Sequence, residues 1–145
     1  KQKGVTYFPT LAATESVTQY KGWKKGVDAE PEAVTQKRKA FKIAMDNGVT
    51  IGMGGDVGVF AHGENVLEME LMVNYGMKPI QVLQAATSVN ARALQMQNKI
   101  GFIKAGHLAD LVIFEGDPSV SISALRKPLW VMKEGVIYQP ESAKK

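Results

Sequence analysis

The sequence predicts an α/β fold, because short runs of β-branched and aromatic residues alternate with segments of helical periodicity between residues 4 and 76. The order of these segments is strand, helix, strand, helix, and the connections are short. In proteins with this order the strands are parallel, and their carboxyl ends meet at a shared face. Side chains with a chemical role are therefore expected where the strands end.

The first predicted strand lies within residues 4–11 and runs into a loop near Pro9. Residues 12–30 are irregular, and no helix is expected there. Pro31 suits the first position of a helix that ends at Gly48. Its residues at helical spacing are Ala33, Val34, Lys37, Ala40, Phe41, Ala44 and Met45.

A second strand is predicted at residues 49–53, and the Gly-Gly-Asp sequence that follows opens a loop. The helix after this loop is expected at residues 65–75, with Gly76 at its end. The stripe assigned to its partly apolar face is Val66, Leu67, Glu70, Leu71 and Asn74.

The composition changes near Lys99, after two short helices that begin at Pro79 and near Ser88. Beyond that point the chain favours strands, predicted at residues 100–103 and 108–114 and in a hairpin at residues 129–138 that turns at Lys133-Glu134-Gly135. We therefore divide the chain into residues 1–98, residues 99–140, and a flexible tail at residues 141–145.

The charge and composition exclude several classes of protein. The chain has 18 Lys and Arg against 14 Asp and Glu, but the excess cations are scattered, so nucleic-acid binding is not expected. The absence of cysteine excludes disulfides and thiolate metal sites. No apolar run approaches the ~20 residues that span a bilayer, so we expect a soluble chain without a membrane partner.

The start at Lys1, without an initiating methionine and close to an apolar segment, leads us to expect further sequence upstream. Any signal peptide would lie there, so the compartment, cytoplasmic or secreted, is undetermined.

Asp56 is the leading candidate for a catalytic role, because it follows a predicted buried strand and two glycines that let the backbone pass close to a ligand. A carboxylate at this position can bind a divalent metal or transfer a proton. It can equally cap the following loop, as aspartates after glycines often do. The residues alone leave both alternatives open.

His62 lies six residues further along the same loop. Its imidazole can contact substrate, transfer a proton or bind a metal. Gly63 and a helix start at Asn65 also allow a purely conformational role for this segment.

Other candidates have ordinary structural explanations. Glu64, Glu68 and Glu70 fall in the first turns of a predicted helix, where the helix dipole favours acidic residues. Met69, Met72 and Met77 are typical core-filling residues, and we assign structural roles to His107 and Asp110 and a turn to Asp117-Pro118.

Four segments, taken in order, resemble the C-terminal region of the amidohydrolase superfamily, nearest to its imidazolonepropionase-like and Xaa-Pro dipeptidase-like branch. The segments are residues 49–56, His62-Gly63, Ala85-Ala86-Thr87-Ser88-Val89-Asn90-Ala91 and residues 100–112, and the resemblance extends over about residues 4 to 138. Relatives often have Ser or Thr where Gly55 stands and Pro where Ala61 stands.

The resemblance implies the last two β/α units of a (β/α)8 TIM-like barrel, together with strands of a small β-sandwich domain. It implies a divalent metal centre, zinc in one or two ions, with Asp56 as a metal ligand that also takes a proton from the attacking water. His62 matches a substrate-contact position. The implied substrate is a small amide or dipeptide-like molecule.

The other metal ligands of the superfamily would all lie upstream of Lys1, so the isolated chain is expected to be inactive. A barrel of this kind needs eight strands and about 250 residues, and the unpaired strand edges of a fragment invite association. We therefore expect the missing N-terminal part of the barrel, or another copy in a homo-oligomer, as a partner. The alternative is a non-catalytic assembly or oligomerisation fragment in which Asp56 is only a cap.

Overall fold

The computed structural model describes residues 4–138, and the chain divides into two compact units, the first ending at Met77 and the second beginning at Lys78. The predicted boundary between residues 98 and 99 is a different one, because it separates barrel segments from strands of a β-sandwich domain. That boundary stays a prediction. The predicted tail at residues 141–145 lies outside the described residues. No helix within residues 4–138 combines the length and the apolar character that a membrane crossing requires.

The first unit contains a parallel pair of short strands, as the alternating pattern predicts. β1 (Thr6–Tyr7) pairs with β2 (Thr50–Ile51), with Thr6 opposite Thr50 and Tyr7 opposite Ile51. The Gly52 N–H extends the pairing with a 3.0 Å hydrogen bond to the Tyr7 carbonyl. The two strands therefore end at the same edge.

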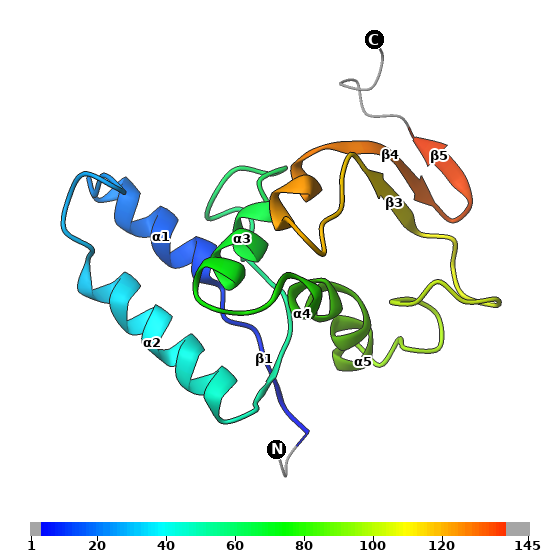
Figure 1. Cartoon of the computed structure of the whole chain (residues 1–145), viewed down its shortest axis with the longest axis horizontal. Coiled ribbons are helices and arrows are strands. Elements are labelled where there is room, and N and C mark those ends of the chain that lie inside the picture. The colour runs from blue at the N-terminus through cyan, green and yellow to red at the C-terminus, as the bar shows by residue number, and fades with distance from the viewer. Residues whose placement is uncertain (1–3, 139–145) are drawn as a thin grey trace. The chain divides into compact units, whose positions relative to one another are not determined.

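Three helices accompany these strands: α1 (Leu11–Tyr20), α2 (Glu32–Asp46) and α3 (Val66–Asn74). The helices predicted after Pro31 and at residues 65–75 are confirmed as α2 and α3. In Figure 1, α1 and α2 are the neighbouring blue and cyan helices, and α1 also contacts α3. The largest apolar side chains of this core are Leu11, Phe41, Leu71 and Met72, all at most 1% exposed.

The irregular pattern of residues 12–30 did not indicate a helix, and for residues 12–20 this is wrong, because α1 occupies residues 11–20; residues 21–30 form neither helix nor strand. Thr14, Val17 and Thr18 are weak helix formers, and the preceding Thr10 makes no side-chain cap and has a left-handed φ of 47°. The helix start is instead held by a carboxylate that is distant in the sequence.

The second unit begins with α4 (Pro79–Gln84), one π-helical turn η1 (Ala85–Val89) and α5 (Asn90–Ala93), which follow one another without a break. An antiparallel sheet follows, formed by β3 (Leu111–Phe114), β4 (Pro128–Lys133) and β5 (Val136–Tyr138), with the 3₁₀ helix η2 (Ile122–Arg126) between β3 and β4. The predicted hairpin is present and turns at Glu134 and Gly135, which both have positive φ.

The strand predicted at residues 100–103 is wrong, because that segment is bent and unpaired. Gly101 has a φ of 87°, and a Cβ added there would lie 2.6 Å from the Ala91 Cβ and 2.9 Å from the Thr87 carbonyl oxygen. The segment packs closely on the end of the helical run in a conformation that an L-residue rarely adopts.

Candidate active site

Asp56 lies in the loop that leaves β2 and is exposed. Its φ of 60° is left-handed, and its backbone carbonyl accepts a 3.2 Å hydrogen bond from the Val59 N–H. Within residues 4–138 its carboxylate takes part in no hydrogen bond or ion pair. Among the described residues, this side chain therefore caps nothing.

Asp56 forms part of the wall of a hollow of about 270 Å³. The other lining residues come from α1 and its end, from the start of α2, and from the Asp56 loop itself. They are Ala13, Thr14, Val17, Thr18, Lys21, Ala33 and Val59. The hollow therefore lies between the segments that follow the two parallel strands.

The backbone just before Asp56, at Gly55, is closely packed against neighbouring side chains. A Cβ added at Gly55 would lie 3.1 Å from the Phe60 Cζ and 3.2 Å from the Glu68 Cβ. The Ser or Thr expected in relatives at this position has little room here. The strand end therefore packs directly on α3, which carries Glu68.

Glu68 caps α1 from α3. Its Oε1 accepts the Leu11 N–H at 3.0 Å, and its Oε2 accepts the Ala12 N–H at 2.7 Å. The side chain is fully buried. Burial raises the pKa of the Glu68 carboxyl above its ordinary value of 4.5, and the two backbone hydrogen bonds oppose that increase.

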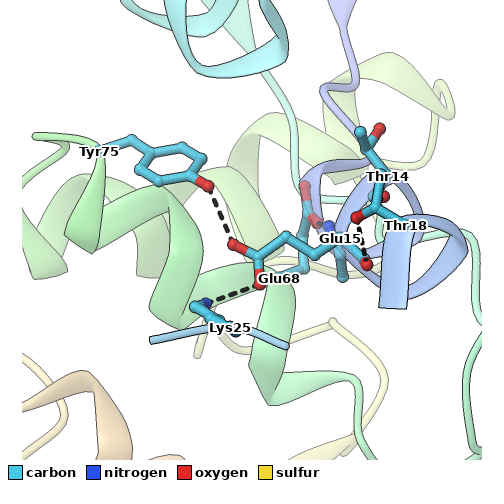
Figure 2. A network of polar contacts seen from close by, with 7 residues as sticks. Thr14, Glu15, Thr18, Lys25, Glu68 and Tyr75 are labelled. Carbon is cyan, nitrogen blue, oxygen red and sulfur yellow. Dashed lines mark hydrogen bonds and ion pairs between the residues drawn. The ribbon is translucent and has the colours of Figure 1, made fainter. Parts of the chain in front are cut away.

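Glu15 forms a second buried polar group, on α1. Its side chain lies within reach of Lys25 and Tyr75 (Figure 2), with Oε2 2.6 Å from the Lys25 Nζ and Oε1 accepting the Tyr75 hydroxyl at 3.0 Å. Burial, followed by the charge of Glu15, raises the pKa of the Tyr75 hydroxyl. The Arg38 guanidinium lies over the Tyr75 ring, 5.6 Å from its centroid. These contacts join all three helices of the first unit.

His62 is exposed in a turn at residues 61–63, and Gly63 after it has a φ of 93°. Among the described residues that line the Asp56 hollow, His62 is absent. Asn65 occupies the N-cap position of α3, as a helix start there implies, but its side chain makes no capping hydrogen bond.

The structural roles expected for other polar residues are observed. His107 Nε2 lies 3.2 Å from the Gln97 carbonyl oxygen, and its ring contacts Phe102 edge-on. Asp110 accepts hydrogen bonds from the Lys133 side chain and the Glu134 N–H, which lower its pKa. Asp117 accepts the Ser119 N–H in the predicted turn.

The described residues of this chain do not form a complete metal site by themselves. Among residues 4–138, no group of three His, Asp or Glu side chains is arranged to hold an ion, and stable sites usually take three or more protein ligands. Asp56 has the chemistry of one such ligand, since its exposed carboxylate is not engaged by other described residues.

Sequence reasoning missed Glu15 and the true role of Glu68. The signal for Glu68 was present: Glu68, Leu71, Met72 and Tyr75 recur at helical spacing, and the first three are the buried residues of α3. A glutamate inside an apolar stripe predicts a buried carboxylate with a partner. No comparable local signal identifies Lys25 and Tyr75 as the partners of Glu15.

The model of the amidohydrolase family matches residues 2–138, almost the whole chain. The chain belongs to the amidohydrolase family. Similar solved structures include a Xaa-Pro dipeptidase with methionine bound in its active site, which is 35% identical with a TM-score of 0.82 over 96% of this chain and 36% of that one. The A. niger ochratoxinase is 25% identical, with a TM-score of 0.76 over 97% of this chain and 33% of that one.

A curated relative of this amidohydrolase chain is the amidohydrolase tasK of Hapsidospora irregularis. The two are 31% identical over 100 residues, which cover 69% of this chain and 10% of the relative. The chain thus spans about a third of the solved proteins that it matches and about a tenth of this relative. The predicted family and its dipeptidase-like likeness are confirmed.

Proposed function

We propose that the chain is the C-terminal part of a metal-dependent amidohydrolase that hydrolyses amide, dipeptide-like C–N bonds with a metal-activated water. In this proposal residues 1–98 supply the last two β/α units of a (β/α)8 barrel, and residues 99–140 supply strands of a small β-sandwich domain. The observation that carries the proposal is the Asp56 carboxylate, which is unpaired among the described residues and lines a hollow beside the strand ends of an amidohydrolase-family chain.

Asp56 acts as one metal ligand and as the proton carrier. Its carboxylate takes a proton from the attacking water and passes it to the amine that leaves when the C–N bond breaks. A divalent ion, zinc in one or two copies, would supply Lewis acidity and a lowered pKa for the bound water. Because one carboxylate cannot hold a catalytic ion alone, the other ligands come from a longer parent protein, and the isolated chain is inactive.

His62 contacts the substrate in this proposal. Its ring is exposed on the same loop as Asp56, where a ligand in the site of the complete enzyme would be accessible to it. A substrate contact predicts that His62→Ala raises KM more than it lowers kcat.

The test uses the longer parent protein loaded with zinc. We expect it to hydrolyse dipeptide-like amides, and we expect Asp56→Asn to lower kcat/KM by at least about 10³-fold, because a proton carrier and a metal ligand are lost together. The zinc content, measured by atomic emission, should fall in the same variant. The 145-residue chain alone should show no turnover.

Asp46→Asn is the matched control, since Asp46 is an exposed carboxylate at the end of α2 whose neighbour Lys42 lies 3.7 Å away. It should leave both zinc content and rate unchanged. A zinc-loaded parent that hydrolyses no amide, with the same zinc content in Asp56→Asn, would overturn the proposal.

The alternative function is that of a non-catalytic assembly fragment. An exposed strand in the second unit supports this alternative. The residues of β5, Val136, Ile137 and Tyr138, are each more than half exposed. A strand of this kind favours association with another copy or with the missing part of the protein. Light scattering decides: a homo-oligomer that persists in Asp56→Ala, in a parent that shows no hydrolysis, favours assembly.

A further inference from the structure

Both strands of the first unit lead into loops with a strained backbone. Among residues 4–77, Thr10 after β1 and Asp56 after β2 are the two non-glycine residues with a positive φ, at 47° and 60°. A left-handed φ is unfavourable for a residue with a side chain, and most of all for a β-branched one such as threonine. Strain of this kind persists only where surrounding contacts fix the backbone.

Glu68 contacts both of these loops from α3. Its carboxylate accepts the N–H groups of Leu11 and Ala12, which directly follow Thr10, at 3.0 and 2.7 Å. Its Cβ packs so closely on Gly55, the residue before Asp56, that a Cβ added there would lie 3.2 Å away. The head of the Glu68 side chain therefore binds the first loop, and its base packs against the second.

The Glu68 carboxylate is itself held firmly in place. The first N–H groups of a helix have no partner within the helix, and Thr10 supplies no side-chain cap for α1. Lys37 of α2 donates to the Thr10 hydroxyl at 3.3 Å, which brings a cation to the same junction. Because Glu68, Leu11 and Ala12 are all buried, a displaced carboxylate would leave two buried N–H groups unsatisfied.

We propose that Glu68 is a positioning residue for Asp56. By joining the first turn of α1 to the backbone at Gly55, it sets the place of the loop that carries the Asp56 carboxylate. Glu68 itself contacts neither metal nor substrate. The effect on catalysis rests on the proposed function, whereas the positioning of the loop is a property of the folded chain.

The first test measures amide hydrogen exchange by NMR in the metal-free 145-residue chain. The reporter is the Val59 N–H, which donates to the Asp56 carbonyl at 3.2 Å, and the reference is the Val49 N–H, which donates to the Ala44 carbonyl at 2.9 Å. The ratio of the two rates separates a local change in the loop from a change in global stability. In Glu68→Gln one acceptor oxygen is replaced by a donor, so we expect this ratio to rise by at least about tenfold.

Glu15→Gln is the matched control. Glu15 is also buried in the first unit, but its partners are the Lys25 ammonium and the Tyr75 hydroxyl, not the backbone at the start of α1. The substitution should lower global stability and leave the ratio within about twofold of the wild-type value.

Gly55→Ala tests the same connection from the other side and does not alter Glu68. The added Cβ pushes on the Glu68 Cβ, so exchange at the Leu11 and Ala12 amides should accelerate by at least about fivefold relative to the Val49 amide. Gly54→Ala is its control, because the Cβ added there meets the Phe8 side chain and not Glu68.

The second test measures kinetics in the zinc-loaded parent protein. Glu68→Gln should lower kcat per bound zinc by about 10- to 100-fold and change KM by less than about twofold, because a displaced proton carrier slows the chemical step more than it weakens binding. Glu15→Gln should retain the wild-type kcat per bound zinc. A purely structural role for Glu68 would lower the amount of folded enzyme and leave this quantity unchanged.

An unchanged exchange ratio in Glu68→Gln, or no acceleration at Leu11 and Ala12 in Gly55→Ala, would overturn the positioning role. So would a kcat per bound zinc that falls equally in Glu68→Gln and Glu15→Gln. A wild-type parent that hydrolyses no amide would instead sink the proposed function, and the exchange rates would still decide whether Glu68 positions the Asp56 loop.

Discussion

Asp56 and Glu68 stand twelve residues apart in the sequence and have opposite surroundings. Glu68 is fully buried and accepts two backbone N–H groups of α1, whereas Asp56 is exposed and its carboxylate accepts none from the described residues. A buried carboxylate that satisfies two helix N–H groups contributes to the fold. An exposed carboxylate that the described residues do not engage contributes little to the fold, so Asp56 is available for the role that is proposed for it above.

The largest expected difference between the two carboxylates is in stability. Glu68→Ala leaves the Leu11 and Ala12 N–H groups unsatisfied and a cavity between α1 and α3, so the free energy of unfolding should fall by about 2–4 kcal/mol. Asp56→Ala should change it by less than about 0.5 kcal/mol. Urea denaturation followed by circular dichroism measures both values, and equal losses in the two variants would remove the distinction.

A smaller loss of stability is expected where the loop before Asp56 contacts α3 at Glu68. Gly55→Ala places a Cβ 3.1 Å from the Cζ of the buried Phe60 ring and 3.2 Å from the Glu68 Cβ, which is fixed to the α3 backbone, so we expect a loss of about 1–2 kcal/mol. Gly54→Ala is the control, because its Cβ would meet the Phe8 Cδ1 at 3.3 Å on a side chain that is 40% exposed. If Gly54→Ala cost as much, the contacts with Phe60 and Glu68 would not be what constrains the strand end.

The sequence predicted those structural features that depend on neighbouring residues, namely α2 and the position of Asp56. α2 has Pro31 before it and Gly48 after it, and Asp56 follows a strand and two glycines, so both could be placed from neighbouring residues. α1 could not, because its start is held by Glu68, 57 residues from Leu11. The predicted stripe of α3 left out Glu68 for the same reason: the helix dipole explained an acidic residue there, whereas the structure buries Glu68 against the start of α1.

The segment at residues 100–103 shows the opposite failure. Its isoleucines and phenylalanine favour a strand, but the close approach of Gly101 to Ala91 and Thr87 imposes a bend. Propensity predicted an element that packing excludes. In both cases the missing information is a contact between residues that are separated in the sequence.

The smallest expected effect is a pH dependence of stability that comes from Glu68. Burial raises the pKa of its carboxyl in the folded chain above the ordinary value of 4.5, so the folded state binds a proton more tightly than the unfolded state does. Its contribution to stability should therefore grow as pH falls from neutral through the folded pKa, and level off below the unfolded value. Asp110 and Asp117, whose pKa values are lowered, lose their contributions only at more acidic pH, below the ordinary value of 3.8. Glu68→Gln should flatten the dependence of the unfolding free energy on pH between neutral pH and 4.5, measured by urea denaturation. A wild-type stability that decreases as the pH is lowered through this range would contradict the prediction, because it would mean that folding favours the Glu68 anion.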